Sequence, residues 1–121
     1  MDLRIDPAST VPPYEQLRTQ VARQATDGSL PAGTRLPPVR QLAAHLGLAA
    51  NTVARAYKEL EADGVVVTEG RRGTFVRSAA LDRPPPDVGS AVSALAHAAR
   101  RRGLTLAETQ RLVEAAWSGR D

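Results

Sequence analysis

Residues 47–64, GLAANTVARAYKELEADG, form the stretch of sequence that decides the fold. The apolar residues that recur there at helical spacing are Val53, Ala56, Tyr57 and Leu60. This periodicity predicts an amphipathic helix over residues 50–63, with Gly64 as its stop. The helix opens on a polar pair, Asn51 and Thr52, which raises the question of whether its exposed face lies against a nucleic acid.

Two further helices are expected upstream. Residues 12–28 begin with Pro and end with Gly, the asymmetry typical of a helix with its flanking residues. A second helix begins at Pro38 and stops at Gly47, and residues 34–36 before it predict a short strand. Because only a short connector separates this helix from the next, the pair predicts a helix-turn-helix, whose second helix can enter a major groove.

The segment that follows predicts a β-hairpin. Residues 65–77, VVVTEGRRGTFVR, indicate a strand, a tight turn and a second strand, with two arginines between two glycines at the turn. A hairpin after a helix-turn-helix is a wing. We therefore expect a mainly α fold with a small β-hairpin wing, a winged helix-turn-helix over residues 1–78.

The rest of the chain predicts a separate helical hairpin. A Pro-rich spacer over residues 79–87 leads to helices at 88–102 and 105–118, the second opening with a capping box at Thr105. The residues expected on its apolar faces, and hence in a dimer interface, are Val88, Val92, Leu95, Leu106, Leu112, Val113 and Trp117. Because two such helices cannot bury both faces, residues 88–121 are expected to pair with a second copy as a homodimer.

Composition excludes several classes of protein. The chain has 121 residues, a net charge of +3 and no cysteine, so it forms neither disulfides nor thiolate metal sites. Its start carries acidic residues, and no stretch reaches the ~20 apolar residues that span a bilayer, so we expect a cytoplasmic protein without membrane contact. His45 and His97 have no companion at metal-ligand spacing. No nucleophile–base pair or phosphate-cradling loop is visible, so we expect no metal, no cofactor and no enzyme activity.

The sequence from Arg35 to Val76, RLPPVRQLAAHLGLAANTVARAYKELEADGVVVTEGRRGTFV, resembles the winged helix-turn-helix of GntR-type bacterial transcription regulators. The preceding segment resembles the family's first helix and turn, so the resemblance covers about residues 10–77. The short two-helix tail is similar to that of the YtrA-like subfamily, where it serves dimerisation. The resemblance thus implies a dimeric DNA-binding regulator.

The resemblance also implies which residues bind DNA. The positions that match the family's start of the second helix, polar pair and wing tip are Arg40, Asn51, Thr52, Gly70, Arg71, Arg72 and Gly73. Arg55 lies one turn along the recognition helix and could equally face DNA or pair with Glu59. Two alanine positions depart from the family pattern. Ala49-Ala50 replaces a common Ser-Arg and Ala54 a frequent arginine, so base reading should fall on Arg40 and Asn51 with support from the wing.

Loss of the serine also removes a helix cap, so either Asn51 or a bound phosphate should satisfy the first N–H groups of the helix. We expect a homodimeric repressor on a palindromic operator, with repression wherever that operator overlaps a promoter. Any small-molecule effector would have to occupy a small pocket, at the dimer interface or between tail and winged helix. The alternative is a winged-helix protein-interaction module with only non-specific DNA affinity, which would explain the alanines but explains the two wing arginines less well.

Overall fold

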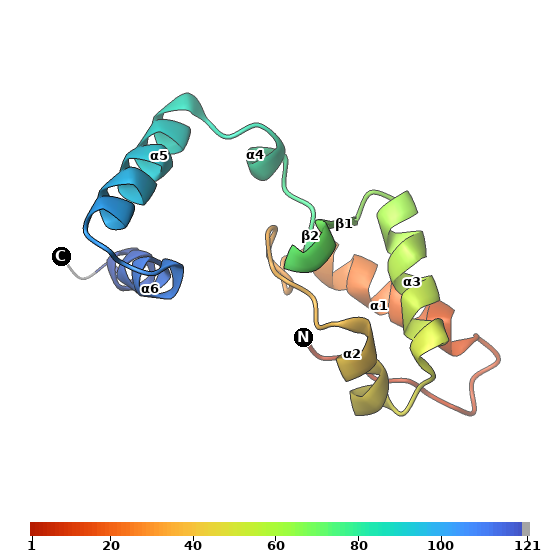
Figure 1. Ribbon diagram of the computed structural model, residues 1–121. Coiled ribbons are helices and arrows are strands. Elements are labelled where there is room, and N and C mark those ends of the chain that lie inside the picture. The colour runs from red at the N-terminus through yellow and green to blue at the C-terminus, as the bar shows by residue number, and fades with distance from the viewer. Residues whose placement is uncertain (120–121) are drawn as a thin grey trace. The chain divides into compact units, whose positions relative to one another are not determined.

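The computed structural model describes residues 1–119 and divides into two compact units, Met1–Leu81 and a second that begins at Asp82 (Figure 1). We call them the winged-helix unit and the tail unit. The first contains α1 (Pro13–Asp27), α2 (Val39–Leu46), α3 (Ala50–Ala62), β1 (Val66–Thr68), the 3₁₀ turn η1 (Gly70–Arg72) and β2 (Thr74–Val76). They are followed by α4 (Ala79–Asp82), α5 (Pro86–Arg101) and α6 (Leu106–Trp117). The predicted fold class is confirmed.

The core of the winged-helix unit lies between its three helices and its hairpin. Its buried members are Leu17, Val21, Leu30, Leu36, Leu42, Ala43, Val53, Ala56, Tyr57, Leu60, Val66 and Val76. The apolar stripe predicted for α3 is therefore buried as a whole. Figure 1 shows α1 and α3 side by side, which places their fully buried leucines and valines against each other. This contact fixes α3 by one face and leaves the other exposed.

The turn between α2 and α3 is held at both of its sides. Gly47 ends α2 in the left-handed conformation with φ +69°, and the Leu48 N–H then donates to the Ala43 carbonyl at 2.9 Å. The Tyr57 hydroxyl of α3 donates to the Pro37 carbonyl at 2.7 Å. Burial of the ring raises the pKa of Tyr57 to about 12. The helix-turn-helix geometry is thus fixed by hydrogen bonds as well as by packing.

The wing is an antiparallel hairpin in which Val66 pairs with Val76 and Thr68 with Thr74. A third segment joins its outer edge, since Arg35 forms a single bridge with Phe75. The short strand expected at residues 34–36 is reduced to this bridge. The bridge nevertheless ties the approach to α2 directly to β2.

An N-terminal arm lies along α1, a feature that the sequence did not reveal. Gln16, Gln20 and Gln24 are spaced one helical turn apart, and their side-chain amides bond the backbone of residues 2–6. Gln20, for example, accepts from the Arg4 N–H at 2.9 Å and donates to its carbonyl at 2.6 Å. The glutamine side chains thus make hydrogen bonds to the backbone of the arm of the kind that a neighbouring strand would make.

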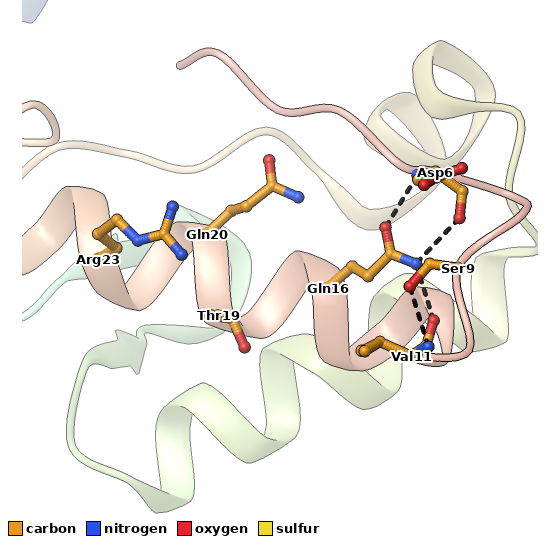
Figure 2. A pocket seen from close by; sticks show the side chains of 7 residues that line it. All are labelled: Asp6, Ser9, Val11, Gln16, Thr19, Gln20 and Arg23. Atoms are coloured by element: carbon orange, nitrogen blue, oxygen red, sulfur yellow. Dashed lines mark hydrogen bonds between the residues drawn. The ribbon is translucent and has the colours of Figure 1, made fainter.

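Beside the arm lies a shallow pocket, drawn in Figure 2. Its lining residues are Asp6, Ser9, Val11, Gln16, Thr19, Gln20 and Arg23. Gln16 also donates to the Val11 carbonyl at 2.7 Å, which closes the arm onto the start of α1. The arm therefore covers the side of α1 that carries these glutamines.

In the tail unit, the capping box predicted at the start of α6 is confirmed. The Glu108 N–H donates to the Thr105 hydroxyl at 3.0 Å, and the Thr105 N–H donates to the Glu108 carboxylate at 2.8 Å. The spacer predicted over residues 79–87 is shorter than expected. The α4 turn occupies its first half, and α5 begins at Pro86 because proline is well accommodated in a first helical turn. No helix within residues 1–119 is long and apolar enough to cross a membrane.

Candidate nucleic-acid interface

The first turn of α3 presents an exposed polar surface. Asn51 is exposed, Thr52 is half-buried, and no acidic residue lies in this turn. The first N–H groups of a helix have no partner within the helix, and together with the helix dipole they favour an anion. The start of α3 is therefore suited to a phosphate group.

The hypothesis that Asn51 caps α3 is wrong. The helix begins at Ala50 with Ala49 as its N-cap in extended conformation, and no side chain makes a capping hydrogen bond. Asn51 and Thr52 consequently belong to the first turn, where their side chains project from the helix. The structure contradicts a cap by Asn51, and a bound phosphate at the first N–H groups stays a prediction.

Arg40 lies in the first turn of α2. Its side chain is exposed and this turn also lacks acidic residues. Within the described part of the chain, the guanidinium has no hydrogen-bond or ion-pair partner. Its charge is thus available to an external anion, as the predicted contact requires.

The wing tip carries the predicted glycines and arginines on a 3₁₀ turn. Gly73 has φ +115° and ψ −166°, a conformation that residues with a side chain rarely adopt. Arg72 lies 3.7 Å from the Glu69 carboxylate, although its side chain is 80% exposed. Arg71, in contrast, has no such partner in residues 1–119, so the two wing arginines are not equivalent.

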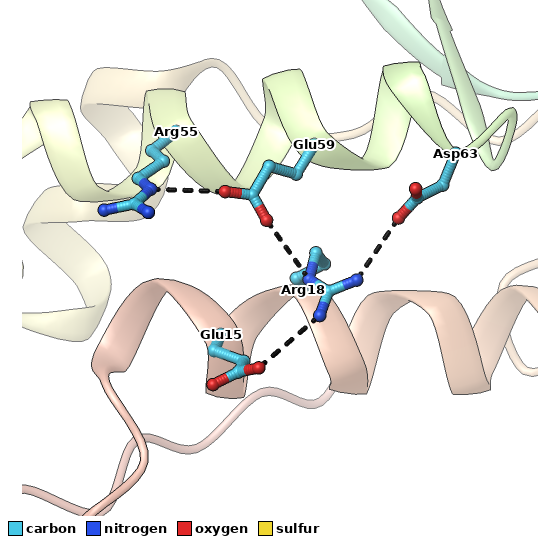
Figure 3. A network of polar contacts seen from close by, with 5 residues as sticks. All are labelled: Glu15, Arg18, Arg55, Glu59 and Asp63. Atoms are coloured by element: carbon cyan, nitrogen blue, oxygen red, sulfur yellow. Dashed lines mark hydrogen bonds and ion pairs between the residues drawn. The ribbon is translucent and has the colours of Figure 1, made fainter.

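Arg55 is held within the protein. Its Nε donates to Glu59 Oε2 at 3.2 Å (Figure 3). Its guanidinium carbon also lies 3.7 Å from the centroid of the Tyr14 ring. The stacking is a cation–π contact between α3 and α1. Of the two roles weighed for Arg55, the structure contains the intramolecular pair. A DNA contact would have to compete with it.

The Glu59 carboxylate also belongs to a second ion pair. In Figure 3, Arg18 of α1 lies between carboxylates from both helices. Its distances are 3.6 Å to Glu15, 3.4 Å to Glu59 and 3.2 Å to Asp63, the contact to Glu59 being an ion pair without hydrogen-bond geometry. Glu59 lies in the C-terminal half of α3 and Asp63 is its C-cap residue, so a polyanion is favoured at the N-terminal half of this helix.

Arg35 was not among the residues predicted from the sequence. Its backbone is bridged to β2, and its guanidinium lies against Gly73 so closely that a Cβ added there would be 2.8 Å from its Nε. The only sequence signal was its position in the short strand expected beside the hairpin. The structure thus brings a further cation to the wing.

The predicted dimerisation residues are exposed large apolar side chains. Leu106 is 73% and Trp117 86% exposed, and the other five also lie on the surface. Between α5 and α6 lies an open groove of about 520 Å³ lined by Val92, Leu95, Ala96, Leu106, Thr109, Gln110, Val113 and Glu114. In the described part of the tail unit only Ala99 is buried. Exposed apolar side chains that gather on one surface often mark an interaction site.

Comparison with known sequences decides the family. Residues 9–76 match the sequence profile of the gntR family of bacterial regulatory proteins, which covers the winged helix-turn-helix described above. The protein belongs to the GntR family. As a GntR-family member it is a DNA-binding transcription regulator, and its relatives are named transcriptional regulators rather than enzymes.

Three relatives place this GntR-family protein more closely. A transcriptional regulator of Mycobacterium tuberculosis is 47% identical over 92% of this chain and 90% of its own length. The transcriptional repressor YtrA of Bacillus subtilis is 42% identical over 61% of this chain and 57% of its own. The structure of YtrA from Sulfolobus acidocaldarius superposes with a TM-score of 0.60 at 30% identity, over 75% of this chain and 97% of that one. The protein is therefore a YtrA-like GntR regulator.

Proposed function

We propose that this protein is a homodimeric repressor that binds a palindromic operator. The N-terminal half of α3 enters the major groove, with Asn51 and Thr52 toward bases and phosphates. Arg40 contacts the same groove or its backbone. The wing, through Gly70 to Gly73, follows the adjoining backbone or minor groove.

One observation supports this orientation on DNA: the start of α3 lacks acidic residues, and carboxylates lie near its end. The first turns of α2 and α3 contain no acidic residue, and Arg40 and Arg71 lack partners in the described chain. At the other end of α3, Glu59 and Asp63 take part in ion pairs with Arg18. A phosphate backbone is attracted to the first end and repelled from the second.

The exposed apolar face of the tail supports the homodimer. Large side chains such as Trp117 and Leu106 remain in water in a single chain, and burial stabilises a dimer by about 25 cal/mol per Å² of apolar area. A second copy of the same hairpin offers a complementary face through two-fold symmetry. A two-fold dimer recognises two inverted half-sites, about 34 Å or a multiple of it apart, and this geometry predicts a palindrome.

The sign of regulation is proposed from similarity. YtrA of Bacillus subtilis is named a repressor, and an operator that overlaps a promoter leads to repression because bound protein excludes the polymerase. A DNA-binding regulator acts where the chromosome is, so we place it in the bacterial cytoplasm. Any effector would act by changing the spacing of the two α3 helices, from a small pocket of the dimer.

The test is a fluorescence-anisotropy titration of the full chain against its own upstream intergenic DNA, at two salt concentrations, with excess random competitor. Binding that survives the competitor and weakens with salt would support a sequence-specific regulator. Affinity equal to that for random DNA would instead favour the protein-interaction module. Replacing both Arg71 and Arg72 with alanine should abolish the DNA affinity while leaving the dimer intact.

A further inference from the structure

We propose that Arg35 is an additional contact to the DNA backbone, made from the segment that pairs with β2 beside the wing turn. This inference rests on the proposed function, because it assumes that the wing and the start of α2 face DNA. It adds a residue outside both the recognition helix and the wing turn.

The backbone of Arg35 is fixed between β2 and the start of α2. The residues on either side of it bond to β2: the Val76 N–H donates to the Thr34 carbonyl at 2.8 Å, and the Leu36 N–H donates to the Thr74 carbonyl at 2.8 Å. Leu36 is buried in the core directly before α2. A movement of the wing relative to α2 would therefore break these hydrogen bonds, so Arg35 starts from a rigid position.

The side chain is directed along the wing by the absence of a side chain at Gly73. A Cβ at that position would lie 2.8 Å from Arg35 Nε and 3.3 Å from one terminal nitrogen. The guanidinium consequently covers the backbone of the glycine that ends the wing turn. Arg35 is nevertheless exposed, so its guanidinium can still meet a group from outside the protein.

The Arg35 guanidinium has no carboxylate partner among residues 1–119. Arg18, Arg55 and Arg72 each have a carboxylate within 4 Å. The Arg35 side chain has neither an ion pair nor a hydrogen bond among residues 1–119, which is true of Arg40 and Arg71 and also of tail arginines such as Arg111. An arginine that is rigidly placed, exposed and unpaired beside a wing suits a phosphate oxygen, which it can meet with two parallel N–H groups.

The experiment measures how DNA affinity depends on salt. Each phosphate contact contributes about −0.9 to the slope of log Kobs against log salt concentration on duplex DNA. We expect Arg35→Ala to make the slope less steep by about that amount per protomer, on the upstream duplex and on a random duplex alike. Arg35→Lys should keep most of the slope, because the charge is retained.

The matched control is Arg23→Ala, which removes the same charge from the side of α1 that faces the N-terminal arm (Figure 2). It should leave the slope unchanged. A parallel measurement of thermal unfolding separates a contact from a structural role. An unchanged slope for Arg35→Ala, with or without a lower melting temperature, would overturn the proposal, as would an equal loss in Arg23→Ala.

The two proposals fail in different ways. If the wild-type protein shows no preference for its upstream duplex over the random one, the repressor function fails. The slope on the random duplex still decides the role of Arg35, because phosphate contacts operate without sequence preference.

Discussion

The two units of this protein bury their apolar side chains by different means. In the winged-helix unit, leucines and valines from three helices and a hairpin meet in one core, and residues such as Leu17 and Leu60 are fully buried. In the tail unit, side chains of the same kind lie on the surface, and among its described residues only Ala99 is buried. The first unit buries its apolar side chains within itself, whereas the second leaves them exposed, as the proposed dimer requires.

This difference separates two tasks. A self-contained unit can present Arg40, Asn51 and the wing in a fixed geometry, because its core holds α2, α3 and the hairpin together. A tail whose apolar face is open can bring two such units to one DNA site. Substitutions in the two units should therefore affect different properties of the protein.

The largest effect is expected in the core of the winged-helix unit. Leu60→Ala removes a fully buried side chain, so it should lower the free energy of unfolding by about 2–5 kcal/mol. The matched variant Leu112→Ala, in the tail, should change the unfolding of the winged-helix unit by about 0.5 kcal/mol or less. Urea denaturation followed by far-ultraviolet circular dichroism measures both. Equal losses for the two leucines would contradict the division into units.

The next effect is expected on the stability of the dimer. Trp117 is 86% exposed in the single chain, so Trp117→Ala should leave the chain folded but weaken the dimer by about 2 kcal/mol, or about 30-fold in dissociation constant. Sedimentation equilibrium measures this change. Arg111→Ala on the same helix is the control and should have little effect. A tryptophan variant that dimerises as tightly as the wild type would remove this residue from the interface.

An effect of similar size is expected at the wing. Arg71→Ala should weaken DNA binding by about 1.5–3 kcal/mol, the range for a hydrogen bond to a charged group, without altering the dimer. The matched variant Arg100→Ala removes an arginine at the end of α5, where a cation is stabilised by the helix dipole. Competition anisotropy should therefore show no loss for Arg100→Ala. If the tail arginine mattered as much as the wing arginine, the tail would also be a DNA-binding surface.

The smallest effect is expected at the hydrogen bond between α3 and the start of α2. Tyr57→Phe should lower the free energy of unfolding by about 0.5–1.5 kcal/mol, because the Pro37 carbonyl loses its donor. Since burial raises the pKa of Tyr57 from 10.0 to about 12, the folded protein holds this proton more tightly than the unfolded chain does. The resulting stability is complete below pH 10 and is lost as the pH rises toward 12.

Denaturant midpoints of the wild type and Tyr57→Phe, compared from pH 8 to pH 11, measure this contribution. The difference between the two proteins should shrink as the pH rises above 10, because only the wild type loses stability through this group. Two parallel profiles would show that the hydroxyl is not buried against Pro37.

Local signals account for what the sequence could predict. The stripe of α3, the hairpin glycines and the capping box at Thr105 all depend on residues a few positions apart, and the structure contains each of them. The wrong prediction of a cap at Asn51 also came from such a local signal. The polar pair suggested a cap, but the N-cap position is Ala49, and Asn51 already lies in the first turn of the helix. Helix ends are set by backbone geometry that neighbouring residue types only favour.

The features that the sequence could not predict join residues far apart in the chain. Arg35 and Gly73 meet only because the segment before α2 pairs with β2. Similarly, the glutamines of α1 bond an arm that has no periodic pattern of its own. Arg18 reaches carboxylates on another helix. Side-chain pairs of this kind follow from tertiary packing, which spacing along the sequence does not specify.

The most direct test of the account is a hydroxyl-radical footprint of the full-length protein on its own upstream DNA. A two-fold dimer predicts two protected patches related by two-fold symmetry, with centres about 34 Å or a multiple of it apart, one for each α3 and its wing. Trp117→Ala should reduce the protection of both patches together at a given concentration. Protection of a single patch, or uniform protection without a centre of symmetry, would contradict a dimer in which two winged-helix units read one palindrome.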